Sequence, residues 1–339
     1  MRLFTFLVLE VLLGPITLTG CVLFMTWALA VTQQKGISMT ALVPLSARWL
    51  LHLQGIRPDP LADDLMNTLP CLNSGFNWAI AGPTLLAMNI SGHTPSLFNL
   101  PPPGAENLGN LINTRTLFFD RALSGYLETV EQVVVLGAGF DTRLFKFCLG
   151  RNLALFEVDQ PNTQMIKKKA LIESDRTLDE IGFVAANFNE ENWIDNLLAA
   201  GFEAGKKTFF LWEGVTYYLT EAVVKETLGS IGEICGVGSA IAFDFFPQHF
   251  YEGRDFWWIP FAINALDWIG EPFRFGPDTD RGNQAAIDQL LAGTGFQLSK
   301  LQMAGATSGE ITGDMTRDMA EDIDPSSGFY GLVVAAKGL

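Results

Sequence analysis

The chain has 339 residues and carries little charge, since 48% of its residues are apolar and only 17% are Asp, Glu, Lys or Arg. Its formal net charge of -15 argues against a nucleic-acid partner, because phosphate binding needs a basic face. The four cysteines and three histidines are scattered without the spacing of a zinc site, so we predict no metal. One large α/β domain with a short appendage is the simplest organisation for this length.

An uncharged apolar stretch, residues 11–31, is long enough as a helix to cross the roughly 30 Å core of a bilayer. We therefore predict that residues 1–35 form a membrane anchor, with the catalytic domain on the cytosolic side. A cleaved signal peptide is one alternative, because Arg2 gives a basic start and Ala28–Ala30 resembles a cleavage site. Another is a helix that breaks at Gly14-Pro15 and lies on the membrane or packs on the domain.

Residues 36–130 are expected to form a helical and loop cap on the catalytic domain. The cap begins with a helical pattern within 37–70 and ends with a helix at about 111–127. Between them, residues 71–110 are rich in Gly, Pro and Asn, so we predict a loosely structured excursion there.

From residue 131 to the end, short apolar runs alternate with helical patterns, which indicates a doubly wound parallel sheet. The regular part predicts five strands, followed by two more strand candidates that are separated by a polar, Gly-rich connection. The expected strands are 132–137, 153–158, 182–186, 207–212, 239–245, 295–302 and 329–336, and the expected helices are 142–149, 161–173, 190–200 and 220–235.

The loop after the first strand contains Gly137 and Gly139, at the place where such sheets bind ligands. Thr142 stands where a dinucleotide motif has its third glycine, which argues against a pyrophosphate and a nicotinamide-dependent dehydrogenase. Glu157 and Asp159 end the second strand, where a carboxylate can accept both ribose hydroxyls of a nucleoside. A nucleoside without a diphosphate fits best, and S-adenosyl-L-methionine is the commonest. The alternative is a plain tight turn with Glu157 as a solvated strand end.

Several linked segments resemble the leucine carboxyl methyltransferase family, including its small-molecule and polyketide O-methyltransferase branch. The resemblance implies a seven-stranded Rossmann-like methyltransferase sheet, mostly parallel with the last strand antiparallel, and helices on both faces. The segments are QVVVLGAGFDTRLFKF (132–147), LFEVDQPNTQMIKKKAL (155–171), LWEGVTYYLTEAVV (211–224), SMTALVPLSARWLLHLQGIRPDPLADDL (38–65) and NTRTLFFDRAL (113–123).

The resemblance implies cofactor-binding roles for particular residues. Arg115 corresponds to the arginine that clamps the methionyl carboxylate of S-adenosyl-L-methionine, a role suited to a bidentate guanidinium. Gly137 and Gly139 correspond to the loop under the methionyl part, Glu157 to the ribose ligand and Glu213 to the acid beside the methionine moiety. The expected product is S-adenosyl-L-homocysteine.

Four further residues belong to this expected cofactor site and acceptor site. Asp141, in the loop after the first strand, is included among the cofactor-binding residues. Asn187-Phe188 stands where the family has Asp before an apolar residue at the adenine, and an Asn amide can still bond the adenine edge. Tyr218 corresponds to the family's tyrosine near the methyl acceptor.

The catalytic residues depend on the acceptor. A carboxylate acceptor needs no base, whereas a phenol or alcohol does. The candidate catalytic residues are Asp244 and His249, near the end of the fifth strand, with Tyr218 as a hydrogen-bonding partner. A surface or lid histidine is the alternative for His249.

An aromatic-rich segment, 245–275, lies in a predicted lid insertion at about 246–290. We expect it to cover the acceptor site, or to pack on its own domain or the membrane. With the anchor, it favours a carboxylate or hydroxyl of a lipophilic polyketide or terpenoid as the acceptor. The alternatives are a protein C-terminal carboxyl methyltransferase, a non-methylating enzyme that catalyses a cyclisation or isomerisation on the same scaffold, and a binding protein with a degenerate site.

Overall fold

The computed structural model describes residues 1–188, 193–268, 270–306 and 327–338. The chain forms two compact units. The first unit consists of Met1–Leu100, Gly139–Lys146 and Pro161–Leu178, and the second of Pro101–Ala138, Phe147–Gln160 and Asp179–Leu339.

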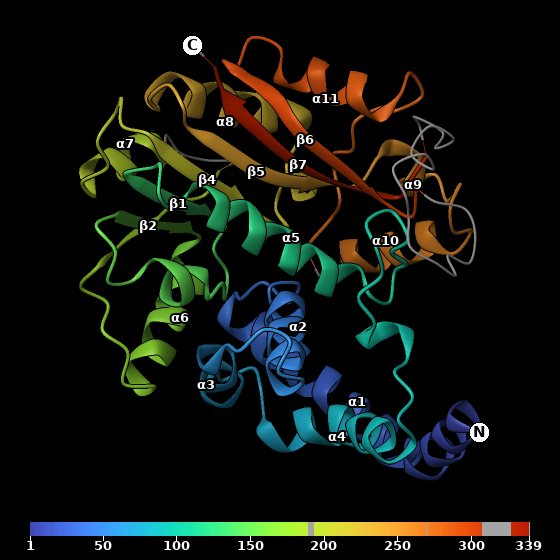
Figure 1. Ribbon diagram of the computed structural model, residues 1–339. Helices are drawn as coiled ribbons and strands as arrows, with labels where there is room; N and C mark the ends of the chain where they lie inside the picture. The colour runs from blue at the N-terminus through green and yellow to red at the C-terminus, as the bar shows by residue number, and fades with distance from the viewer. Residues whose placement is uncertain (189–192, 269, 307–326, 339) are drawn as a thin grey trace. The chain divides into compact units, whose positions relative to one another are not determined.

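The second unit contains a seven-stranded sheet in the order β3-β2-β1-β4-β5-β7-β6 (Figure 1). Strands β1 to β5 pair in parallel, and β7 pairs antiparallel with both β5 and β6. This confirms the predicted mostly parallel sheet with an antiparallel last strand. The strands are β1 (Gln132–Leu136), β2 (Ala154–Asp159), β3 (Ile181–Ala185), β4 (Thr208–Trp212), β5 (Ala240–Phe245), β6 (Phe296–Ala304) and β7 (Tyr330–Lys337).

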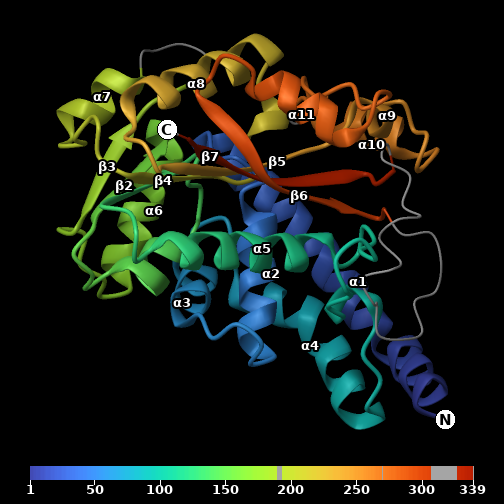
Figure 2. The same cartoon turned by 45° about the horizontal axis from the view of Figure 1, so that its top comes forward.

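Helices cover both faces of this sheet. In Figure 2, α8 and α11 lie on one face and α5 lies on the other. Burial on both faces explains why β1 and β4 are apolar after their first residue, and why β5 is apolar apart from Asp244, without alternation. The core packs Phe210, Ile231 and Ile287 together, all without solvent exposure. The helices of this unit are α5 (Leu111–Tyr126), α7 (Trp193–Ala199), α8 (Glu221–Ile234), α9 (Gln248–Tyr251), α10 (Ile259–Trp268) and α11 (Asn283–Leu291), with a 3-10 turn, η3 (Thr216–Tyr218).

The helix expected at 142–149 is replaced by one π-helical turn, η2 (Leu144–Cys148). The Arg143 N–H donates to the side chain of Asp141 at 2.6 Å, so this end of the loop is fixed by a side chain. The first helical hydrogen bond, from the Lys146 N–H to the Thr142 carbonyl, comes only three residues later. A tight loop, held by its own polar residues, takes the place of the first helical turn.

The first unit is helical in its described residues. The cap of α3 follows from its sequence, because Asp59 accepts from the Ala62 N–H and Pro60 occupies the first turn. The elements of this unit are α1 (Arg2–Lys35), α2 (Leu42–Leu53), α3 (Pro60–Thr68), α4 (Ser74–Ser91), the 3-10 turn η1 (Ser96–Phe98) and α6 (Pro161–Glu173).

Helix α1 is continuous, so the alternative of a break at Gly14-Pro15 is wrong. Pro15 has no N–H to donate to the Val11 carbonyl, and the long helix continues through the loss of this one backbone hydrogen bond. By length and composition α1 can cross a membrane, and only 11% of its most apolar 18-residue window is buried. The expected long apolar N-terminal helix is therefore present, whereas its attachment to a membrane stays a prediction.

The loose excursion predicted for 71–110 is wrong over residues 74–91, which form α4. Asn73 caps its start by accepting from the Gly75 N–H at 2.9 Å, and Gly92 ends it in the left-handed conformation with φ 66°. Pro83 lies inside the helix. The sequence of α4 has a weak helix propensity, and contacts with α1 offset it. No local pattern in the sequence reveals these contacts.

Two glycines of α8 make a test of the packing on the sheet. A methyl group added at Gly232 would lie 1.7 Å from the backbone oxygen of Thr294, whereas one added at Gly229 has nothing within 4 Å. We expect Gly232→Ala to lower the free energy of unfolding by about 1–3 kcal/mol through overpacking. Gly229→Ala should raise it by up to about 1 kcal/mol through helix propensity. Urea denaturation measures both, and equal effects of the two variants would contradict the described packing.

Candidate functional site

The parallel strands bring the predicted residues of the second unit to one edge of its sheet. Gly137 follows β1, Glu157 lies near the end of β2, and Asn187 follows β3. Glu213 directly follows β4, and Asp244 is the penultimate residue of β5. Because the carboxyl ends of parallel strands share an edge, residues distant in sequence meet there. The edge therefore has the composition expected of a ligand site.

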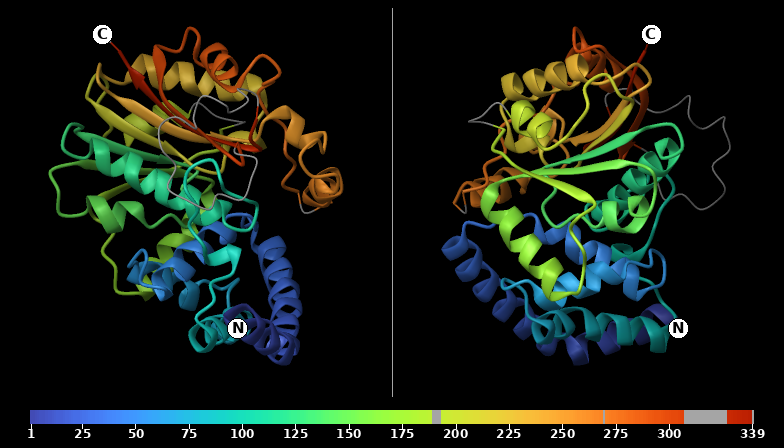
Figure 3. Two further views of the ribbon diagram at one scale, coloured as in Figure 1. Left: turned by 45° about the vertical axis from the view of Figure 1, so that its right-hand side comes forward. Right: turned by 90° about the vertical axis from the view of Figure 1, so that its left-hand side faces the viewer.

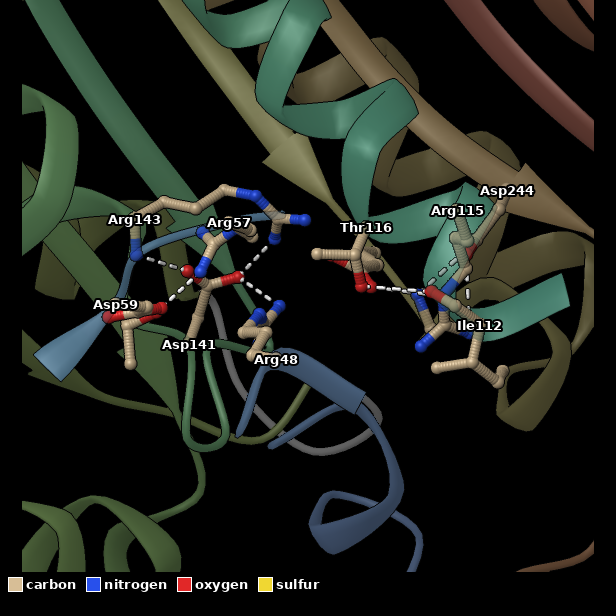
Figure 4. A network of polar contacts seen from close by, with 12 residues as sticks. Arg48, Arg57, Asp59, Ile112, Arg115, Thr116, Asp141, Arg143 and Asp244 are labelled. Carbon is tan, nitrogen blue, oxygen red and sulfur yellow. Dashed lines mark hydrogen bonds and ion pairs between the residues drawn. The ribbon is translucent and has the colours of Figure 1, made fainter. Parts of the chain in front are cut away.

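A buried guanidinium lies at the centre of this edge. Arg115, on α5, is 3% exposed, and its Nε donates to Glu213 Oε1 at 2.9 Å. Its Nη1 donates to the hydroxyl oxygens of Tyr330 at 3.1 Å and Tyr217 at 3.4 Å. The same nitrogen lies 3.7 Å from Asp244 Oδ2 (Figure 4). One cation thus connects α5 with the segments that follow β4 and with β5 and β7.

Asp244 organises the segment after β4. Its Oδ1 accepts from the Gly214 N–H at 2.8 Å, and its Oδ2 accepts from the Tyr330 hydroxyl at 2.5 Å. Its backbone oxygen accepts from the Thr216 hydroxyl. Burial raises the pKa of the Asp244 carboxyl to about 6, although Arg115 opposes this shift. Burial also raises the pKa of Tyr217 to about 12, so its hydroxyl is protonated at neutral pH.

Two positions of the second unit require glycine because the backbone has a positive φ and neighbouring atoms approach closely. Gly137 has φ 62°, and a Cβ there would lie 2.4 Å from the Val215 side chain. Gly214 has φ 75°, and a Cβ there would lie 3.4 Å from the Tyr217 hydroxyl. The backbone of the segment after β1 therefore approaches the segment after β4 closely.

An aromatic cluster lies beside the Arg115 network. The Tyr217 ring is 4.7 Å from that of Phe273 and 5.1 Å from that of Phe246, measured between centroids. Phe246 also lies 4.6 Å from Tyr330, and Tyr218 lies 5.2 Å from Phe273. Rings of the predicted lid insertion thus contact the two tyrosines that bond to Arg115. This packing places an apolar wall next to the polar edge.

The structure places the three predicted catalytic residues in different surroundings. Asp244 belongs to the Arg115 network, and Tyr218 belongs to the aromatic cluster. His249 lies 3.1 Å from the Thr279 hydroxyl through Nδ1 and 3.1 Å from the Gly328 carbonyl through Nε2. Both ring nitrogens of His249 therefore have partners. This agrees with the alternative interpretation of His249 as a surface or lid histidine. A catalytic role for the three stays a prediction.

The predicted adenine contact Phe188 and the predicted ribose ligand Glu157 lie in different surroundings. Phe188 packs its ring 5.5 Å from Trp193 and 6.3 Å from Trp212. Glu157, the predicted ribose ligand, is 1% exposed within the sheet and pairs in register with Val135 of β1. The backbone of Glu157 is therefore held in the sheet.

Asp141 belongs to a separate network within the first unit (Figure 4). Its Oδ2 accepts from Arg48 at 2.8 Å and from Arg143 at 2.5 Å. Burial would raise the pKa of this carboxyl, but the two guanidinium groups hold it well below its usual range. Nearby, Asp59 pairs with Arg57. Asp141 thus anchors the loop that Gly139 begins with φ 47°, and its contact with a cofactor stays a prediction.

Sequence reasoning missed two tyrosines of the site. Tyr217 directly precedes the predicted Tyr218, and the adjacent pair was a signal that either ring could face the site. Tyr330 gave no such signal, because its position depends on the insertion of β7 beside β5. That pairing sets Gly331 opposite Phe245 and so brings Tyr330 to the edge.

The raised pKa of Asp244 predicts how stability depends on pH. The folded protein binds this proton more tightly than the unfolded chain, so stability falls as pH rises from about 4 to about 6 and then levels off. The loss should reach about 3 kcal/mol, and Asp244→Asn should abolish it. Chemical denaturation at several pH values measures this. The control Asp288→Asn alters an exposed carboxylate of α11 and should keep the dependence; a slope unchanged in Asp244→Asn would contradict the assignment.

Comparisons with known proteins agree with this architecture. A sequence model described as leucine carboxyl methyltransferase matches residues 53–232. A candidate S-adenosyl-L-methionine-dependent methyltransferase of Rhodococcus jostii is 30% identical over 242 residues, covering 70% of this chain and 74% of that protein. A candidate methyltransferase of Parafrankia is also 30% identical, and the match covers 62% of this chain. This chain spans 65% of that relative's length, just under two thirds.

A solved structure shows the same fold. The crystal structure of a candidate methyltransferase from Thermobifida fusca has a TM-score of 0.50 at 14% identity, covering 82% of this chain and 94% of that one. Together, these findings show that the chain belongs to the leucine carboxyl methyltransferase family and has the class I methyltransferase fold.

Proposed function

We propose that the protein transfers a methyl group from S-adenosyl-L-methionine to a carboxylate or hydroxyl oxygen of a lipophilic small molecule of polyketide or terpenoid type. The observation that carries this proposal is the aromatic wall beside the Arg115 network. Phe246 and Phe273 contact Tyr217, whose hydroxyl accepts from Arg115. A flat or greasy acceptor suits such rings, and a polar peptide suits them less.

The residues at the strand ends fit the cofactor. The hydrogen bonds of Arg115 use Nε and Nη1, and within the described part of the chain Nη2 donates to no group. A second carboxylate, that of the methionyl group, can therefore pair with Arg115 while Glu213 stays near the methionyl ammonium. Glu157 would accept the ribose hydroxyls, and Asn187 would bond the adenine edge.

The other residues would shape the reaction through position. The bound cofactor supplies an electrophilic methyl group, and an anionic acceptor needs mostly alignment and the exclusion of water. Both oxygens of Asp244 already accept hydrogen bonds, so we assign it to holding Gly214 and Tyr330 in place. A carboxylate acceptor then needs no base, whereas a hydroxyl acceptor would react as a phenolate that has already given its proton to solvent. The rings of the aromatic cluster would exclude water.

The proposed attachment of α1 to a membrane agrees with a lipophilic acceptor, because such a compound concentrates in the bilayer. We propose that the catalytic domain faces the cytosol, where its cofactor would be found. The apolar surface that α1 exposes supports the attachment.

Binding of the cofactor tests the assigned site. We expect Arg115→Lys to weaken S-adenosyl-L-methionine about tenfold or more, because an ammonium cannot reproduce the fork of a guanidinium. Arg121→Lys, on the exposed side of the same helix, is the matched control and should bind normally. Titration calorimetry measures both, and circular dichroism confirms folding. Equal affinity in the two variants would remove Arg115 from the site.

Turnover with defined acceptors tests the substrate class. We expect the purified protein to methylate apolar carboxylic acids or phenols, with one S-adenosyl-L-homocysteine formed for each methyl ester or ether. Phe273→Ser should raise the KM for such acceptors, because it removes a ring of the aromatic cluster, and should leave cofactor affinity unchanged. Mass spectrometry identifies the products. Methylation of a polar peptide alone, or conversion of an acceptor without S-adenosyl-L-homocysteine, would sink the proposal.

A further inference from the structure

Helices α1 and α4 of the first unit pack side by side in opposite directions (Figure 3). Near the end of α1, the Trp27 indole donates to the Pro70 carbonyl at 3.2 Å. In its middle, a Cβ added to Gly20 would lie 2.8 Å from the Cβ of Ala79. Near its start, the rings of Phe6 and His93 are 5.1 Å apart. Contact through Gly20 and Ala79 is the small-residue packing that helices use in lipid.

The pair exposes apolar side chains that water does not favour. On α1, twelve large apolar residues are exposed on most sides of the helix, including Leu12 and Leu23. On α4, Trp78, Leu86 and Ile90 are exposed. A contiguous apolar surface of this kind marks a partner or a membrane.

The charge pattern selects the membrane as the partner. The chain has no Asp, Glu, Lys or Arg over residues 11–34 and again over 65–105, which include all of α4. A protein partner would face a helix on one side, whereas α1 is apolar on most sides. Only a fluid hydrocarbon covers such a helix and its neighbour together.

The direction of α4 then limits how the pair can lie. At the end of α4 the chain lies beside the start of α1, and it must return from there to α5, which begins at Leu111. The return segment, 93–110, is irregular apart from the 3-10 turn η1. Irregular backbone exposed to lipid costs several kcal/mol for each unsatisfied group, so this segment does not cross a bilayer.

The rest of the chain fixes the side to which it returns. Two segments of the first unit, 139–146 and 161–178, are joined directly to the strands of the sheet. Arg48 of α2 pairs with Asp141 in the first of these segments, which closely follows β1, so the chain connection keeps the strands on the same side of the membrane as α2. If α1 spanned the membrane with α4 beside it, the start of α1 and the end of α4 would be stranded on the opposite side.

We propose that α1 and α4 together form a membrane-embedded pair that lies in the plane of one leaflet and does not span the bilayer. Both ends of α1 then remain on the side of the catalytic domain, and α4 contributes Trp78 and Leu86 to the lipid contact. This inference rests on the proposed membrane attachment and is independent of the methyl acceptor.

The test uses the full-length protein synthesised in the presence of sealed phosphatidylcholine vesicles. Flotation first establishes attachment. A membrane-impermeant amine reagent is then added, and mass spectrometry follows the N-terminal amine of Met1. Lys169, whose side chain is 78% exposed, reports the accessible side. For an in-plane pair we expect the Met1 amine and Lys169 to react together, before the vesicles are permeabilised.

A second measurement examines α4 itself. A fluorophore on Leu86→Cys, in a Cys21→Ser background, should lose most of its emission when the vesicles carry nitroxide lipids. Leu86 is 49% exposed, and the matched control Leu198→Cys, from a leucine 38% exposed on α7, should keep its emission.

Each outcome decides the inference. Reaction of the Met1 amine without permeabilisation, together with quenching at Leu86→Cys, supports the in-plane pair. Protection of this amine until the vesicles are opened shows that α1 spans, and leaves the attachment standing. A bound protein with no quenching at Leu86→Cys removes α4 from the membrane surface. Failure to float with the vesicles contradicts both the attachment and the in-plane pair. This result would be expected if a second copy of the chain covered the apolar surface.

Discussion

The buried guanidinium of Arg115 is the constraint on which the second unit depends. A charge taken out of water is costly unless its hydrogen-bond donors and its charge find partners. Glu213, Tyr217 and Tyr330 accept from it, and Asp244 lies within ion-pair distance. These partners come from segments on different strands, so the cation can be buried only when those segments have all reached their places. The site and the fold thus share one electrostatic requirement.

Much of the fold was predictable because each strand has a local reason to form. Runs such as QVVVL in β1 are short, β-branched and buried on both faces, and glycines or polar residues end them. Helix α4 was not predictable in this way, because two Gly, one Pro and two Asn interrupt its 18 residues. Its stability depends on packing against α1, which is distant in sequence. The π-helical turn after β1 likewise depends on Asp141, whose side chain replaces a helical hydrogen bond.

The polar site was predictable to the extent that strand ends determine it. Glu157 and Asp244 follow from the rule that parallel strands share an edge, whereas Arg115 and Glu213 followed from the family resemblance. Tyr330 could not be placed, because β7 inserts antiparallel between β5 and β6, and only this register brings the residue beside Arg115. The roles of the candidate residues could not be predicted in this way, because they depend on the cofactor and on the methyl acceptor.

The distance in sequence between Arg115 and Tyr330, 215 residues, has a consequence for synthesis. When α5 leaves the ribosome, all four groups that will surround its cation, Glu213, Tyr217, Asp244 and Tyr330, belong to strands or turns not yet made. Until β7 has been made, it costs less free energy to leave the Arg115 guanidinium in water than to bury it. Helix α5 therefore does not pack in its final position before then. The cofactor edge is therefore expected to mature only after β7 has been made, when the parallel strands have already left the ribosome. A ribosome that stalls before β7 would leave a sheet without a site.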